Sequence, residues 1–243
     1  MDMVGGRVVL HKQPFFDHFK ELNKRIIQSL ILAMFFSVIA YFNYSNLYEV
    51  LVNPLKKAGF STNDLLSFTL YEGFQVKITN TIFIGILVSL PFIVFIIGNF
   101  FIPAFEKLSK SKFIFNLILF LLFFYTGIFS AFKTFPFAIE FFLSFNDANF
   151  ILRTQSYFQL LFRICLLFGL TFQLPLLVAF LISKEVIKIS LITNNRREVF
   201  ILLLILSAII TPTGDPITLF IFAIPLYLFI ELVIYIQIKR NKN

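Results

Sequence analysis

Six runs of apolar residues, separated by short polar stretches, are the feature that most limits what this chain can fold into. They cover residues 26–42, 78–101, 113–132, 160–182, 199–210 and 217–236. A helix rises about 1.5 Å per residue and the hydrocarbon core of a bilayer is about 30 Å thick, so runs two, three, four and six can each cross a membrane as a helix. The first run reaches that length by extending at both ends. We therefore expect an all-α integral membrane protein with six transmembrane helices.

The composition agrees with this fold class. Of the 243 residues, 58% are hydrophobic and only 14% are charged, which leaves too little polar surface to cover a soluble globule. No polar block between the runs is large enough to fold separately, so residues 1–243 are expected to form a single membrane domain. The net charge of +8 is spread over short loops rather than gathered on one polar face, which argues against a nucleic-acid partner.

The fifth run is short for a membrane helix, because its 12 residues would cover only about 18 Å. It is followed by the turn sequence "TPTGDP" and then by the sixth run, so helices five and six are both expected to be short. One interpretation is a buried half-helix or an ordinary span with polar ends. The other is a short hairpin that thins the bilayer locally.

Prolines inside the runs indicate that the bundle is curved. Pro91, Pro175 and Pro225 each lie within an apolar run, where the missing amide and the ring clash kink a helix. Prolines are also tolerated in ordinary membrane helices, so these three residues alone do not distinguish a transporter from a receptor.

The distribution of cations predicts the orientation of the chain. Fifteen of the 21 lysines and arginines fall on one side of the membrane, in the amino-terminal segment, in the connections after runs two and four, and in the carboxyl-terminal tail. Since positively charged loops stay on the inner side, both termini are predicted to lie inside. The opposite side then carries two longer connections, 43–71 and 133–159. In the first, Leu47, Val50, Leu51 and Leu55 have near-helical spacing and predict a short interfacial helix, interrupted at Pro54.

Catalytic and metal-binding patterns are missing from the sequence. The two histidines, His11 and His18, both lie near the amino terminus, and no His, Cys and carboxylate set has metal-ligand spacing. There is no phosphate-binding glycine loop and no nucleophile beside a plausible base. We therefore expect neither an enzyme nor a bound cofactor.

Polar residues at or within the runs are the remaining candidates for function, since burying them in a membrane is costly. They are Glu72 at the start of run two, Gln173 in run four and Glu231 in run six. Glu231 is either paired with a polar neighbour or kept neutral by burial, or it has a functional role. Gln173 either makes an ordinary hydrogen bond between helices or contacts a partner.

Five short motifs resemble a known family when they are read in order. They are "HFKELNKR" at 18–25, "LPFIVFIIGNFFIP" at 90–103, "FGLTFQLP" at 168–175, "TPTGDP" at 211–216 and "AIPLYLFIE" at 223–231. Each motif is weak alone, but their joint order is similar to that of TatC, the multispanning subunit of the twin-arginine protein translocase. The family architecture, six helices with both termini inside, also matches the expected topology.

The resemblance implies a receptor that binds signal peptides of folded precursor proteins at the inner face, for transport driven by the proton gradient. It implies small single-helix partners of the TatA and TatB type, self-association and contact with membrane lipid. The residues expected in the signal-peptide site are Glu21, Arg25, Phe100, Pro103, Glu106 and Ser109. Those expected as intramembrane or partner-helix contacts are Gln173, Asp215 and Glu231.

Three positions depart from the family pattern. Asn23 stands where an arginine is expected, Ser109 stands where a second acidic residue is expected, and Gln173 replaces a glutamate. Glu106, about one helical turn from Ser109, is a possible substitute for that carboxylate. Gln173 keeps its hydrogen-bonding capacity but cannot titrate, which favours contact with a partner helix over proton relay.

Two further questions stay open at the level of sequence. A small-molecule secondary transporter is the alternative function, although a transporter would be expected to line a midplane site with several polar side chains. The sixth run, "FAIPLYLFIEL", resembles proteobacterial and mitochondrial members of the family more than plastid ones, and this resemblance favours the mitochondrial inner membrane as the location, with the plastid thylakoid and the bacterial inner membrane as alternatives.

Overall fold

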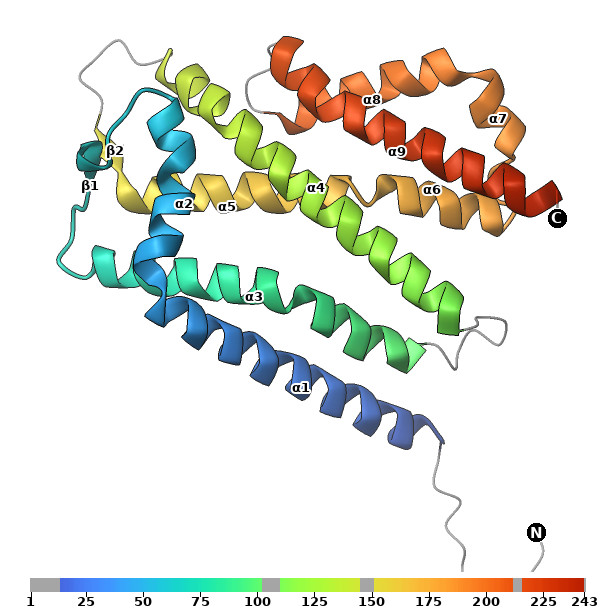
Figure 1. The fold of residues 1–243 in the computed structure, drawn as a ribbon, viewed down its shortest axis with the longest axis horizontal. Helices are drawn as coiled ribbons and strands as arrows, with labels where there is room; N and C mark the ends of the chain where they lie inside the picture. The colour runs from blue at the N-terminus through green and yellow to red at the C-terminus, as the bar shows by residue number, and fades with distance from the viewer. Residues whose placement is uncertain (1–13, 102–109, 145–150, 212–215, 243) are drawn as a thin grey trace, which may run out of the picture.

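The computed structural model describes residues 14–101, 110–144, 151–211 and 216–242, and in these ranges it is almost entirely helical. Figure 1 shows the helices packed as an elongated bundle, with the start of α1 and the end of α9 at the same end. We call that end the inner end and the opposite end the outer end. The helices are α1 (Pro14–Phe42), α2 (Tyr44–Lys57), α3 (Glu72–Phe101), α4 (Lys110–Leu143), α5 (Thr154–Thr171), α6 (Leu174–Ser183), α7 (Ile189–Asn194), α8 (Arg196–Ile210) and α9 (Pro216–Lys242).

Five segments of the described chain are long and apolar enough to cross a membrane. They lie in α1, α3, α4, the α5–α6 pair and α9, and they confirm an integral membrane protein with helices at five of the six predicted runs. The fifth run forms α8, whose 15 residues cover about 22 Å. Its shortness agrees with the sequence, but the expectation that helix six is also short is wrong, because α9 has 27 residues and is long enough to cross a membrane. The role of α8 as a sixth span stays a prediction, as does the inner location of both termini.

The third and fourth runs differ from their predicted bounds. Helix α4 continues to Leu143, eleven residues beyond the predicted end at Phe132, so most of the first half of the 133–159 connection is helical. Lys133 does not end the helix, since lysine is a good helix former, and its ammonium group lies over the ring of Phe129, 5.2 Å from the centroid. Beyond it, Phe135 is buried against the ring of Tyr157 on α5, 5.5 Å between centroids.

The fourth run breaks into two helices at Phe172 and Gln173, two residues before Pro175. Pro175 has no amide to donate, so it is suited to the first turn of α6 but not to the interior of a continuous helix. The prediction of a distortion at Pro175 is thus confirmed. Helices α3 and α9 continue through Pro91 and Pro225, and α2 continues through Pro54, so the predicted interruption of the interfacial helix is wrong.

Helices α1 and α3 lie side by side along most of their length (Figure 1). Gly85 permits this approach, because a Cβ atom there would lie 2.1 Å from Ser37 Oγ and 2.5 Å from its backbone nitrogen. Close approach of small residues is how helices associate in lipid, where no hydrophobic force draws apolar surfaces together. The α1–α3 pair carries the amino-terminal motif at its inner end.

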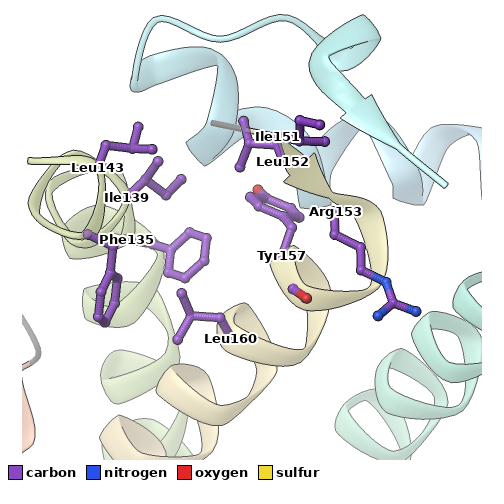
Figure 2. Close-up of a pocket in the computed structure, with 10 residues that line it drawn as sticks. Phe135, Ile139, Leu143, Ile151, Leu152, Arg153, Tyr157 and Leu160 are labelled. Atoms are coloured by element: carbon purple, nitrogen blue, oxygen red, sulfur yellow. The ribbon is translucent and has the colours of Figure 1, made fainter. Parts of the chain in front are cut away.

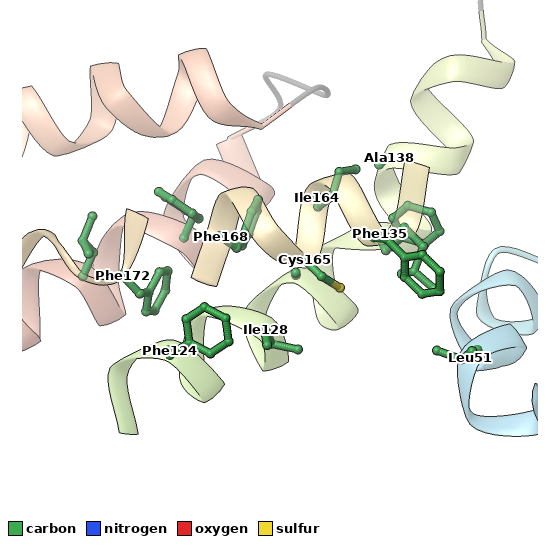
Figure 3. Packing of buried hydrophobic residues seen from close by; sticks show 14 of the residues in the cluster. Leu51, Phe124, Ile128, Phe135, Ala138, Ile164, Cys165, Phe168 and Phe172 are labelled. Atoms are coloured by element: carbon green, nitrogen blue, oxygen red, sulfur yellow. The ribbon is translucent and has the colours of Figure 1, made fainter. Parts of the chain in front are cut away.

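The core lies between α4, α5 and α9 (Figure 3). Phe168 on α5 packs edge-on against Phe222 on α9, 4.4 Å between ring centroids, and Phe172 packs against the same ring. Gly127 on α4 brings the helices together, since a Cβ atom there would lie 2.7 Å from the carbonyl oxygen of Phe168. Cys165 is buried in this core as a free thiol.

The outer end is closed by α2 and by a short parallel pairing of two strands, β1 (Leu65–Leu66) with β2 (Leu152–Arg153). Figure 1 shows α2 crossing the long helices there. The hydroxyl of Tyr157 on α5 donates to the carbonyl oxygen of Leu51 on α2 at 2.9 Å, which ties α2 to the bundle.

A larger side chain at the α1–α3 crossing is expected to destabilise the protein. Gly85→Ala places a methyl group against the Ser37 backbone, and overpacking of this kind costs about 1–3 kcal/mol. Gly73→Ala is the matched control, because nothing lies within 4 Å of a Cβ atom at that position of the same helix. Thermal unfolding of the detergent-purified protein should show a lower melting temperature for the first variant only. Equal melting temperatures would contradict the close crossing.

Candidate functional site

The inner end of the α1–α3 pair brings together three of the residues that the sequence predicted as a site. Glu21 and Arg25 lie one turn apart on α1, and Phe100 lies in the last turn of α3. The other three, Pro103, Glu106 and Ser109, fall in 102–109, outside the described residues.

Arg25 is bonded to both helices of the pair. Its Nε and Nη2 atoms both donate to Oε1 of Glu21, at 3.1 and 2.6 Å. Its Nη1 atom donates to the carbonyl oxygen of Ile96 on α3 at 2.8 Å, and its guanidinium lies 5.9 Å from the centre of the Phe100 ring. The side chain is 25% exposed, against 47% for Glu21. Arg25 is therefore the more buried, anchored partner of the pair, and Glu21 is the more exposed one.

In this geometry the two oxygens of the Glu21 carboxylate have different hydrogen-bonding states. Oε1 accepts two hydrogen bonds from Arg25, which fills its two lone pairs. Among the described residues, no donor bonds to Oε2. A cationic ligand that arrives at the inner end therefore meets one oriented and exposed carboxylate oxygen.

Charge and apolar surface meet around this oxygen. Lys20, Asn23 and Lys24 are exposed on the same helix, and Asn23 makes no hydrogen bond within the described part of the chain. Phe19 on α1, two residues before Glu21, is exposed at 62%, and Phe95 on α3, next to the Ile96 acceptor of Arg25, is exposed at 47%. An exposed carboxylate beside exposed aromatic rings suits a ligand that carries both a guanidinium and apolar side chains.

Glu231 is held in a separate polar cluster between α8 and α9. Its Oε1 atom accepts a hydrogen bond from the Tyr227 hydroxyl at 2.9 Å and lies 3.3 Å from Nε of Arg196. Glu231 is therefore paired with polar neighbours, which was one of the interpretations that the sequence left open. Sequence reasoning did not identify Tyr227 and Arg196 as its partners, although Tyr227 is four residues away on one helix face.

Gln173 lies at the break between α5 and α6, partly buried. Its amide nitrogen donates to the carbonyl oxygens of Gly169 and Phe120 at 3.3 and 3.4 Å, and the second of these joins α5 to α4. Its buried Oε1 atom has no partner among the described residues. The predicted interhelical hydrogen bond is present but long, and the amide keeps an unused acceptor. Asp215, the third residue of this set, lies outside the described residues.

Glu72 is at the centre of a polar cluster at the outer end, and the sequence noted it only as a polar residue. It is fully buried, and its carboxylate accepts hydrogen bonds from the backbone of Phe68 at 2.9 Å, from Arg153 Nε at 3.2 Å and from the backbone of Gln155 at 3.1 Å. The cluster joins the start of α3 to the start of α5 at the outer end. The signal in the sequence was that Glu72 and Arg153 were predicted on the same side of the membrane.

A second outer cluster fixes the corner between α1 and α2. The ammonium group of Lys77 on α3 lies 4.1 Å from the centre of the Tyr41 ring, and the amide of Asn80 donates to the Tyr44 hydroxyl oxygen at 3.2 Å. Burial raises the pKa of Tyr44, which keeps the phenol protonated. These contacts set the angle at which α2 crosses the bundle.

The outer ends of α4 and α5 enclose a cavity of about 290 Å³ (Figure 2). Phe135, Ile139, Tyr157 and Leu160 form its walls, and the guanidinium of Arg153 points away from it. The cavity is thus apolar and presents no reactive group. Within the described residues, no three His, Cys, Asp or Glu side chains lie close enough to hold a metal ion.

Comparisons with known proteins agree on one family. Residues 17–225 match the model of the Sec-independent protein translocase protein (TatC) family. The chain is 30% identical to the Sec-independent protein translocase protein TatC of Carboxydothermus hydrogenoformans, covering 91% of each chain. It is also 30% identical to a tatC-like protein of Reclinomonas americana, covering 93% of this chain and 88% of that one. A crystal structure of the twin-arginine translocase receptor TatC matches the fold with a TM-score of 0.63 and 27% identity, over 90% of this chain and 96% of the other.

Replacing Gln173 is expected to leave the fold almost unchanged. Its two hydrogen bonds are long and one buried oxygen is unpaired, so Gln173→Leu loses little and removes an unsatisfied acceptor. Phe172→Leu is the control, since Phe172 is fully buried and its loss leaves a cavity that costs on the order of 1–3 kcal/mol. Melting temperatures of the two purified variants should separate clearly. A larger loss for Gln173→Leu would assign the amide a structural role.

Proposed function

Since this chain belongs to the TatC family of Sec-independent protein translocase proteins, we propose that the inner end of its α1–α3 pair receives the signal peptides of precursor proteins. The chain is an integral membrane subunit of such a translocase. The ligand we propose is a peptide with paired arginines, because the similar crystal structure is that of a twin-arginine translocase receptor.

One observation carries this proposal. Glu21 presents an unpaired carboxylate oxygen at an exposed helix edge, beside exposed aromatic rings. A guanidinium binds a carboxylate through short charge-assisted hydrogen bonds, and the apolar part of a signal peptide suits the exposed rings of Phe19 and Phe95. We place Pro103, Glu106 and Ser109 in the same site as a proposal from their positions in the sequence.

Arg25 has a different role in this proposal from the one that the sequence suggested. Its guanidinium is bonded to Glu21 and to the Ile96 carbonyl oxygen, so it orients the carboxylate and does not itself receive the peptide. Loss of the Arg25 charge would reduce electrostatic repulsion of a peptide with two arginines and so strengthen binding. Loss of the hydrogen bonds that orient the Glu21 carboxylate would weaken binding, so the two effects on affinity have opposite signs.

Partner subunits are proposed at the α5–α6 break. Gln173 offers an unused amide oxygen there, which suits a hydrogen bond to a small single-helix subunit of the TatA or TatB type. Asp215 is proposed as a second partner contact, whereas the pairing of Glu231 with Arg196 favours a structural role. We also propose that residues 1–243 form one domain and that copies of the chain associate with one another.

The mitochondrial inner membrane is the proposed location. The residue sequence of the sixth run supports this location, and so does the 30% identity to the tatC-like protein of Reclinomonas americana. Fractionation of cells with an antibody against this chain tests it. Recovery in thylakoid or bacterial membranes would overturn it.

Glu21→Gln is expected to weaken binding of a twin-arginine signal peptide roughly tenfold, because the neutral amide loses the charge-assisted hydrogen bond. Fluorescence anisotropy with a labelled synthetic peptide and the full chain in nanodiscs measures the Kd. Glu49→Gln is the control, since Glu49 is an exposed carboxylate on α2 at the outer end. If the Glu21→Gln variant binds the peptide as tightly as the wild type, and both variants are equally abundant, the signal-peptide site does not lie at Glu21.

Arg25→Met is expected to weaken binding of the same peptide several-fold, although the variant removes a positive charge beside the site. Arg25→Lys keeps the charge but loses the two-bond geometry, so it should weaken binding as well. Lys24→Met removes a neighbouring cation and should leave binding equal or stronger. In a Glu21→Gln background, Arg25→Met should add no further loss. Stronger binding by Arg25→Met would show that charge repulsion outweighs orientation.

A further inference from the structure

Arg163 is a charged residue inside the membrane-crossing part of α5 that the proposed function does not use. It lies nine residues after Thr154, the first residue of the helix, or about 13 Å from the outer end of α5. The side chain is exposed, and no described residue makes a hydrogen bond or an ion pair with its guanidinium. An unpaired arginine at this depth is costly, so it is expected to have an anionic partner.

The exposed face of α5 continues from this arginine in both directions. Toward the outer end, Ser156 and Gln159 are exposed on the same face and make no hydrogen bond with the described residues. Toward the inner end, the exposed residues are Leu166, Leu170 and Leu177, the last of them on α6. One helix face is thus polar in its outer part and apolar in its inner part.

The direction of the helix brings the charge toward the outer surface of the membrane. Side chains on a helix lean toward its amino terminus, and the amino terminus of α5 lies at the outer end. A long arginine side chain that leans this way reaches the interface while its methylene groups stay in the apolar layer. Gln159 and Ser156 lie along that path.

The polar and apolar parts follow one another in the order of a phospholipid. The polar part, from Ser156 to Arg163, covers about 10 Å, and the outward lean of Arg163 carries its guanidinium from the apolar layer toward the headgroups. Leu166 and Leu170 continue the apolar part toward the end of α5 at Thr171, and Leu177 follows beyond the break on α6. This order of polar and apolar surface is that of a phospholipid in the outer leaflet.

We propose that Arg163 binds the phosphate of an outer-leaflet phospholipid, with the Gln159 amide as a second donor and an acyl chain along the exposed leucines. An acidic residue on a partner helix would also neutralise the charge. The polarity of the face and the outward lean of Arg163 favour the lipid. The bound lipid fixes the depth of α5, and with it the level of the α5–α6 break.

The test uses the full chain in phosphatidylcholine vesicles that contain a phosphatidylglycerol probe with a photoactivatable group beside the phosphate. Arg163→Gln is expected to reduce labelling of 154–171 about tenfold, the value of one charge-assisted hydrogen bond. Arg163→Lys keeps the charge and should retain most of the labelling, which keeps the test valid if the glutamine variant fails to fold. A diacylglycerol probe without the phosphate should label the wild-type helix only weakly.

Lys133→Gln is the matched control. Lys133 is an exposed cation in the outer half of α4, but α4 runs in the opposite direction and its ammonium lies over Phe129, one turn nearer the inner end. Labelling of 154–171 should not change in this variant. Equal labelling of wild type and Arg163→Gln, or equal labelling by the diacylglycerol probe, would overturn the proposal. So would a photo-crosslinker at Ser156 that, in native membranes, attaches only to another protein.

Discussion

The buried carboxylate of Glu72 is the interaction on which the arrangement of the described helices most depends. It accepts hydrogen bonds from two backbone amides and from Arg153, and these donors come from the segment before α3 and from the start of α5. A buried charge is stable only when its hydrogen bonds are complete, so the segments that supply the donors must meet at one point. The α1–α3 pair is thereby joined to the rest of the bundle at the outer end. Farther along the two helices, Phe83 on α3 stacks on Phe162 on α5 at 3.9 Å between ring centroids. The inner end of the pair carries Glu21 and Arg25 at an exposed edge.

The sequence predicted the membrane helices because hydrocarbon thickness translates directly into the length of an apolar run. It was less successful where charge and proline were used as boundaries. Lys133 lies inside α4, where its ammonium group is over an aromatic ring one turn away, and Pro54 lies inside α2. Pro175 did mark a break, since it follows the point where α5 ends. The pairing of β1 with β2 joins residues more than eighty positions apart, and two-residue strands leave no periodic pattern to read.

The candidate site was predicted in part. Of the residues that the motifs predicted to lie together, Glu21, Arg25 and Phe100 do lie close to one another, and their role as a binding site stays a proposal. The contact between Arg25 and the Ile96 carbonyl oxygen was not predictable, because a backbone acceptor on another helix has no signature in the residue type. The same holds for Gln173, whose partner on α4 is the backbone of Phe120. Glu231 and Arg196 are an ion pair between helices that only the packing of α8 against α9 brings together.

The one-sided distribution of cations has a consequence under an electrical potential. With the termini on the negative side, as the cation count predicts, Lys20, Lys24 and Arg25 lie at the low-energy end of the membrane field. Moving one elementary charge across the membrane against 100 mV costs about 2.3 kcal/mol. With Glu21 between them, this turn of α1 carries a net charge of +2, so in that orientation it resists movement of α1 toward the outer side while the membrane is energised. The potential would then hold the inner end of α1 at the surface in addition to its bonds to α3, and depolarisation would remove the first restraint and leave the second unchanged.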